Sequence, residues 1–249
     1  MDRTAAYNCR AIAFLQTNQG DKASGLLRKS LKRALAEVLH HGAGPAMCEE
    51  DIVKMTTGPC DVAAIRQESV AWTVETVPIP DLPAHDESGS IFAFFNRCFL
   101  FVQADNHTQV PAPLTKSELA GALLFNMGQT TLLSCKDSSR LTVALRYFEL
   151  ADRILRDQLD VAGASDVSRC ILLAVTNNIG LIYSNLANYE ETVYCREVLC
   201  ELLAPISMAH EDGEEDSTEH STMDEDEYLF FFMSMFCSQG MKMMTAPCA

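Results

Sequence analysis

The sequence predicts a mainly α fold, built from antiparallel helix hairpins with a small inserted β-hairpin. Apolar residues recur at helical spacing in six segments, which group into three hairpins at about 3–41, 115–156 and 166–203. Two runs rich in β-branched and aromatic residues lie between the first two hairpins, within about 69–102. A chain of 249 residues is long enough to bury one continuous core, so we expect a single domain over 1–249.

The first hairpin is predicted to consist of helices at about 3–18 and 22–41. Gly20-Asp21 interrupts the helical pattern, and Asp21 is placed to cap the second helix. An apolar stripe follows along that helix, formed by Leu27, Leu31, Ala34, Leu35 and Val38. Gly42 comes at the expected stop.

The second hairpin is predicted to begin at Thr115, which forms a capping box with Glu118. Its second helix, at about 140–156, places an apolar face inward through Ala144, Phe148, Ala151 and Leu155.

The third hairpin is predicted to begin near Asp166. Asn188 with Glu191 caps its second helix, which we expect Pro205 to end near Leu203.

The insert is predicted to be a β-hairpin of the runs 69–77 and 90–102, separated by prolines and a turn. The second run is apolar on both faces and is therefore expected to be buried. Arg97 lies within it and is expected to pair with an acid such as Glu75 or Asp105, or to bind an anionic ligand. Near the C-terminus, 228–237 is predicted to be a third strand or a short buried helix, because periodicity does not decide between them.

The helical segments carry a repeated motif. Asn126-Met127-Gly128 is matched by Asn178-Ile179-Gly180, and Tyr183 follows the second glycine at the third position. This pattern resembles the tetratricopeptide repeat, in which small residues let the two helices of a hairpin approach closely. The two glycines are 52 residues apart instead of about 34, which indicates divergent repeats with long connections. The overall layout is also similar to a family of algal proteins with no known activity.

The resemblance implies a protein–protein interaction module, in which stacked hairpins form a concave face for an extended peptide or a helix. It implies that this groove is lined by Ala122, Phe125, Gln129, Leu132, Asn177, Leu181, Ser184 and Asn185. The basic clamp of chaperone-binding repeats is missing, since the corresponding helices carry only Lys116 and Arg169, both at their starts.

The net charge of the chain limits the classes of partner that we expect. The net charge is −15, and the segment 210–227 contributes ten acids and no Lys or Arg. We expect this segment to be a solvated, disordered loop. An acidic chain disfavours nucleic acid as a partner. No secretory signal and no apolar run of about 20 residues is found, so we expect a cytoplasmic or nuclear protein that is not in a membrane.

No catalytic motif is found, so we expect a protein that is not an enzyme, with no catalytic residues, bound metal or cofactor. The phosphate-binding loop, the nucleophile elbow and the zinc-protease helix are all missing from the sequence. His40, His41, Cys48 and Cys60 are metal-ligand types, but their spacing matches no closed zinc site. Two alternatives remain: a structural protein that forms homo-oligomers through 228–237 as an exposed strand, and an enzyme of unknown reaction.

Overall fold

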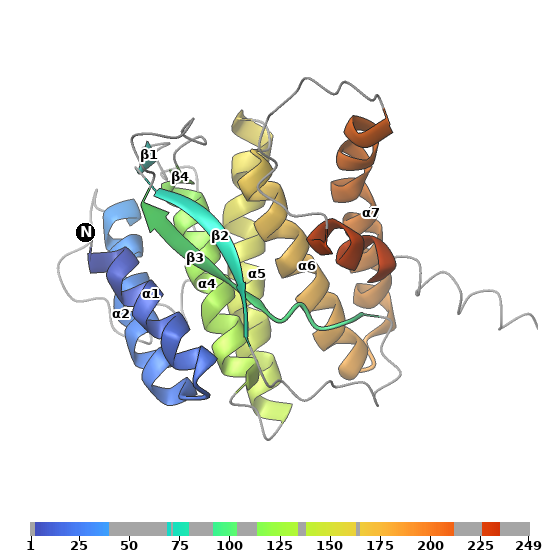
Figure 1. The fold of residues 1–249 in the computed structure, drawn as a ribbon. Helices are drawn as coiled ribbons and strands as arrows, with labels where there is room; N and C mark the ends of the chain where they lie inside the picture. The colour runs from blue at the N-terminus through green and yellow to red at the C-terminus, as the bar shows by residue number, and fades with distance from the viewer. Residues whose placement is uncertain are drawn as a thin grey trace, which may run out of the picture.

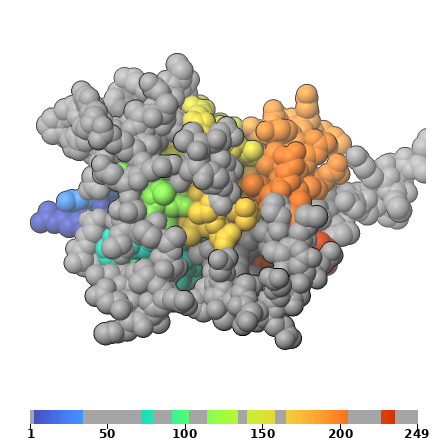
Figure 2. Space-filling model, turned by 90° about the horizontal axis from the view of Figure 1, so that it is seen from above, coloured from blue at the N-terminus to red at the C-terminus, as the bar shows by residue number. Residues whose placement is uncertain are grey.

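The computed structural model describes residues 3–39, 69–70, 72–79, 92–103, 114–133, 138–162, 165–211 and 226–234. The fold is mainly helical with small antiparallel β elements, as predicted. Three hairpins follow one another: α1 (Arg3–Gln16) with α2 (Gly20–Leu39), α4 (Lys116–Leu133) with α5 (Ser138–Ala162), and α6 (Asp166–Asn185) with α7 (Tyr189–Glu211). Because α2 packs on α4 and α5 packs on α6, the hairpins share one core (Figure 1). From above, the first hairpin and α7 lie at opposite ends (Figure 2).

The first and third hairpins turn in the same way. Asn18 and Ala187 both have φ of 55°, the left-handed conformation that ends many helices. The amide of the following residue donates back into the helix, from Gln19 to Phe14 O and from Asn188 to Tyr183 O. α2 begins at Gly20, so Asp21 lies in its first turn, and the prediction that Asp21 caps this helix is wrong.

The predicted caps of the later hairpins are present. The Thr115 hydroxyl accepts from the Glu118 amide at 3.2 Å, and the Glu118 carboxylate accepts from the Thr115 amide at 2.6 Å. The buried Glu118 also accepts from Ser165 and Ser168, so it joins the start of α4 to the start of α6. The Asn188 side chain accepts from the Glu191 amide, as predicted.

The end of α7 was predicted wrongly. The helix continues through Pro205 to Glu211 instead of ending near Leu203. A proline removes one main-chain hydrogen bond and can bend a helix without ending it.

The inserted β-hairpin is confirmed. β2 (Trp72–Pro78) pairs antiparallel with β3 (Arg97–Gln103), in a register from Trp72 opposite Gln103 to Pro78 opposite Arg97. A second short pair, β1 (Ser69–Val70) with β4 (Leu114–Thr115), leads directly into α4. The β2–β3 ribbon crosses in front of α4 (Figure 1).

The C-terminal apolar run is a helix at 226–234, not a strand. Its buried residues, Glu227, Phe231 and Ser234, recur at helical spacing. Residues 228–234 therefore do not form the exposed strand through which pairing between copies was expected.

Two features describe the core. Within the described residues, α6 is the one helix long and apolar enough to cross a membrane, and 78% of its most apolar window is buried inside the fold, as in the core helix of a folded domain. The glycine of the first repeated motif permits close packing, since a Cβ on Gly128 would lie 2.5 Å from the ring of Phe148. Phe148, Ala144, Ala151 and Leu155 are fully buried, as predicted.

Candidate functional site

The face shared by α1, α4 and α6, here called the inner face, holds an extended piece of the same chain. This piece, residues 92–103, comprises an unpaired stretch at 92–96 and then β3. Its main chain is bound by side chains of all three helices, from Asn8 and Cys9 through Asn126 and Gln129 to Asn177 and Asn178.

The strand register explains which backbone groups the helices bind. The Ile79 amide donates to Asn96 O at 2.9 Å, which makes these two residues a hydrogen-bonded pair. Antiparallel pairs alternate, so residues 97, 99 and 101 direct their N–H and C=O groups away from β2. Continuing the same alternation, residue 95 does so too. These groups lie along the edge of the segment that faces the helices.

Two asparagines bind this edge in the same way. Asn126 accepts from the Phe99 amide at 2.9 Å and donates to Phe99 O at 2.8 Å. Asn178 accepts from the Phe95 amide at 3.1 Å and donates to Phe95 O at 3.4 Å. An amide side chain that both donates and accepts reproduces the hydrogen bonds of a neighbouring strand. The asparagine of each repeated motif therefore occupies a place that a third strand would otherwise fill.

Other side chains complete the edge. Gln129 donates to Phe95 O and to Arg97 O, the latter at 3.1 Å. Asn8 donates to Phe99 O at 2.9 Å and accepts from Asn126 at 3.0 Å, while Cys9 donates to Phe101 O at 3.4 Å. The buried main chain is thus paired without a strand, which avoids the cost of unsatisfied polar groups.

The glycine of the second motif also serves this segment. A Cβ on Gly180 would lie 2.5 Å from the ring of Phe92, so only glycine leaves room for that ring. Further along, Phe95 and Phe99 pack on Phe125 with ring centroids 6.2 Å and 5.0 Å apart. Both the backbone and the side chains of 92–101 are therefore fitted to the inner face.

The eight residues predicted to line an open groove do not share one accessible surface. Of these, Ala122, Phe125, Gln129 and Asn177 are fully buried, Leu181 is nearly so, Leu132 and Ser184 are half-buried, and Asn185 is exposed. Gln129 and Asn177 do bind an extended peptide, but that peptide is the chain's own, since Asn177 donates to Ala93 O at 2.8 Å. No part of this arrangement shows a partner protein.

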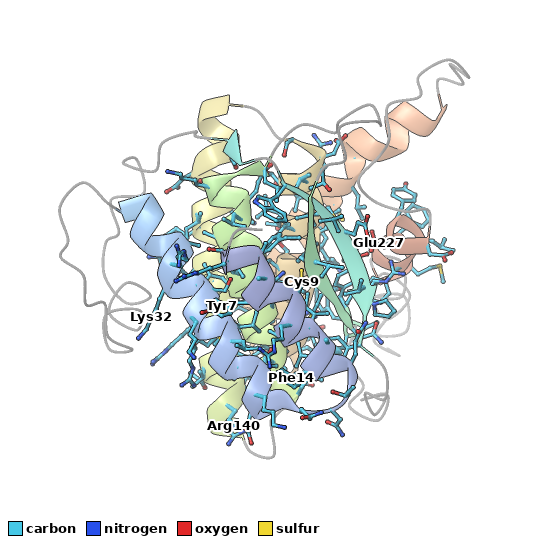
Figure 3. All side chains as sticks on the ribbon, turned by 60° about the vertical axis from the view of Figure 1, so that its left-hand side comes forward. Tyr7, Cys9, Phe14, Lys32, Arg140 and Glu227 are labelled. Atoms are coloured by element: carbon cyan, nitrogen blue, oxygen red, sulfur yellow. The ribbon has the colours of Figure 1, made fainter. Side chains whose placement is uncertain are left out.

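Arg97 pairs with an acid that the sequence did not point to. Its guanidinium lies 2.6 Å from Glu227 Oε1, and the Thr76 hydroxyl also donates to this carboxylate. Glu75, one of the two expected acids, is exposed, and Asp105 lies outside the described residues. The ribbon is held between α1, which carries Cys9, and the helix 226–234, which carries Glu227 (Figure 3).

Both ends of the acidic segment are helical. Glu211 belongs to α7, and Asp226 and Glu227 belong to the C-terminal helix, where Glu227 is 2% exposed. The prediction of a solvated loop over 210–227 is therefore wrong at both ends, and its middle, 212–225, lies outside the described residues.

The outer edge of the ribbon differs from the inner one. By the same alternation, Trp72, Val74 and Thr76 direct their backbone N–H and C=O groups away from β3. In the part of the chain that the structure describes, no strand lies along this edge, because β2 pairs with β3 alone. Within the described residues, helix side chains therefore bind the inner edge of the ribbon, and no strand pairs with its outer edge.

The described residues contain no cluster of three or more His, Cys, Asp or Glu that could hold a metal ion. The four candidate zinc ligands considered above, at positions 40–60, lie outside them. Comparison of the chain with protein-family models, curated proteins and solved structures returns no match.

Proposed function

We propose that this protein is an interaction module of the tetratricopeptide-like type, which binds an extended peptide of a partner protein along the outer edge of β2. The observation that carries this proposal is that the two edges of the β2–β3 ribbon have different neighbours. Helix side chains bind the inner edge, whereas no described strand pairs with the outer edge. An exposed strand edge is a template for another extended chain, and main-chain hydrogen bonds supply much of the affinity in such complexes.

The helices act as the support of the ribbon. The order in which α2 packs on α4 and α5 on α6 is consistent with stacked hairpins. Because the chain's own segment fills the inner face, a partner strand on β2 is the arrangement that requires no displacement of buried phenylalanines. Glu75 is exposed on β2, so we expect the bound peptide to carry Lys or Arg opposite it.

Selection from a displayed library of random peptides tests the proposal, with the affinity of selected peptides then measured by fluorescence anisotropy. Val74→Pro removes only an amide that points away from β3, and proline is tolerated at such an edge position. Val74→Ala is the matched control for loss of the buried side chain. We expect Val74→Ala to retain peptide binding and Val74→Pro to weaken it at least about tenfold, the effect of one lost hydrogen bond plus a steric block.

Equal affinities for the two variants, with both folded by circular dichroism, would refute binding at this edge. Light scattering on the chain without peptide tests whether a second copy occupies the edge instead. A dimer that Val74→Pro converts to a monomer would make the chain its own partner.

A further inference from the structure

A second concave site lies on the opposite side of α6 from the inner face. Its volume is about 440 Å³, and α5, α6 and α7 all line it. Thr176, Ile179 and Tyr183 of α6 form its floor, and their spacing of three and four residues places them on one helix face. Asn177 and Asn178, which bind the segment 92–103, are on the other face. The volume is in the range of small-molecule sites in proteins.

The lining of this pocket is predominantly acidic. Glu149, Asp152 and Asp157 come from α5 and Glu191 comes from α7, against Arg153 and Arg156. Arg156 is already engaged, since its Nε lies 2.8 Å from Asp152 Oδ2. Glu149 accepts a hydrogen bond from the Tyr183 hydroxyl at 2.9 Å, so its partner in this contact is a hydroxyl and not a cation. The acids in the pocket therefore exceed the cations that could neutralise them.

The carboxylates converge on the pocket's titratable groups. Burial raises the pKa of the Cys195 thiol to about 12, and Asp152 and Glu191 add to the rise. Burial also raises the pKa of Tyr183, with Glu149 and Glu191 contributing. Carboxylates of α5 and α7 thus both raise the pKa values of groups that line this pocket.

A polar group without a partner lies in the same place. Thr176 is 2% exposed, and its hydroxyl has no hydrogen-bond partner among the described residues. A buried hydroxyl normally finds one, so this position can hydrogen-bond an added group at low cost. Tyr183 and the 55% exposed Tyr194 provide aromatic surface beside the carboxylates.

We propose that this pocket binds a small organic cation carrying a primary ammonium or guanidinium group. Carboxylates bind such a group through charge-assisted hydrogen bonds, and the tyrosine rings attract it through their faces. A metal ion is the poorer fit, since the described residues form no metal-ligand cluster. The site is separate from the outer edge of β2, so it does not depend on the proposed peptide binding.

Calorimetric titration at low ionic strength tests this proposal, with 1,4-diaminobutane, agmatine and blocked lysine as cations and 1,4-butanediol as the uncharged control. Binding of blocked lysine as tightly as the diamine would indicate a protein side chain as the natural ligand. Stronger binding of the free amines would indicate a small metabolite. The diol should not bind in either case.

Three variants make the test specific. Glu191→Gln removes a pocket charge at constant size, and Glu197→Gln removes one from the exposed side of the same helix. We expect at least about a tenfold loss for the first and little change for the second. Thr176→Val should leave the unfolding midpoint unchanged or raise it, and it should lower the affinity for the cation. If the hydroxyl had only a structural role, its removal would not change that affinity. No saturable binding, or equal losses in both glutamate variants, would overturn the proposal and indicate only general attraction to an acidic chain.

Discussion

At the scale of single residues, side-chain amides form the backbone hydrogen bonds that a neighbouring strand would otherwise form. Asn126 connects α4 to both α1 and β3, through Asn8 and the two backbone groups of Phe99. All of these groups are buried, so each needs its partner. The apolar surroundings make Asn126 costly to replace even though it contributes little hydrophobic area.

Asn126→Ala should therefore lower the free energy of unfolding by about 2–4 kcal/mol, because it leaves the Phe99 amide and the Asn8 carbonyl without partners. Urea denaturation measures this loss. Asn185→Ala is the control, since Asn185 is exposed on a neighbouring helix, and it should change stability by less than about 0.5 kcal/mol. Similar effects of the two substitutions would contradict the role of Asn126.

Because the pKa of the Cys195 thiol is raised, we expect the free energy of unfolding to fall at alkaline pH. Burial raises its pKa to about 12 in the folded state, compared with about 8.5 in an unfolded chain. The contribution of the neutral thiol is complete below about pH 8.5 and declines as the pH rises toward 12. Cys195→Ala should show a smaller decrease in unfolding free energy between pH 8 and pH 10.5 than the parent. Parallel decreases would show that this thiol does not titrate as inferred.

The sequence predicted the inner-face residues only in part. The repeat resemblance placed Gln129 and Asn177 in a groove for a partner's peptide, whereas in the structure both bind the chain's own segment 92–103. The peptide's origin was not visible, because Asn178 and Phe95 are 83 positions apart and nothing local joins them. Arg97 shows the same limit, since its acid is 130 positions away whereas the expected partners were near in sequence.

At the scale of elements, two helix glycines differ in the space around them: one lies at a close contact between helices and the other has no close neighbour. Gly128 faces the ring of Phe148, whereas a Cβ on Gly25 in α2 would meet nothing within 4 Å. Both residues lie inside helices, where alanine is intrinsically the better helix former.

Gly25→Ala should stabilise the protein by about 0.5–1 kcal/mol, because it gains helix propensity without a clash. Gly128→Ala should destabilise it by about 1–3 kcal/mol, because the added methyl group forces the Phe148 ring to move. Thermal unfolding of the two variants side by side provides the comparison. A stabilising Gly128→Ala would mean that α4 and α5 are less closely packed than described.

Helix positions followed from periodicity and caps, because those signals lie within a few residues of each other. The six helices of the three hairpins begin within a few residues of their predicted starts and the capping box forms at Thr115, although α5 and α7 run past their predicted ends. The run 228–237 was ambiguous because it is apolar at nearly every position. Its helical identity depends on which residues are buried, and Phe231 contacts Phe95, which is far away in the sequence.

At the scale of the whole molecule, the C-terminal helix packs on the ribbon and on the stretch that precedes β3. Phe230 and Phe231 pack on Phe95, with ring centroids 5.4 Å and 4.9 Å apart, and Glu227 pairs with Arg97. The last described helix therefore stabilises a segment from the middle of the chain.

Glu227→Ala should lower the free energy of unfolding by about 2–4 kcal/mol, somewhat less than for a fully buried pair, because Arg97 is 25% exposed. Deleting 212–223 removes acids that precede this helix, and we expect little change in the unfolding midpoint because the length of the connection between two helices affects stability weakly. Differential scanning calorimetry of both proteins tests the contrast. A large loss on deletion would show that those acids contribute to the fold.

A ribbon with one edge bound by asparagines and one edge open also limits the valency of any assembly made through it. In the described residues the β2–β3 ribbon offers a single unpaired strand edge, so joining two copies by that edge uses both edges and leaves none for a third copy. Stacking through the ribbon ends at a pair or at a one-to-one complex. Asn126 and Asn178 already bind the other edge of the ribbon, so further copies cannot add there and the assembly cannot grow into a filament.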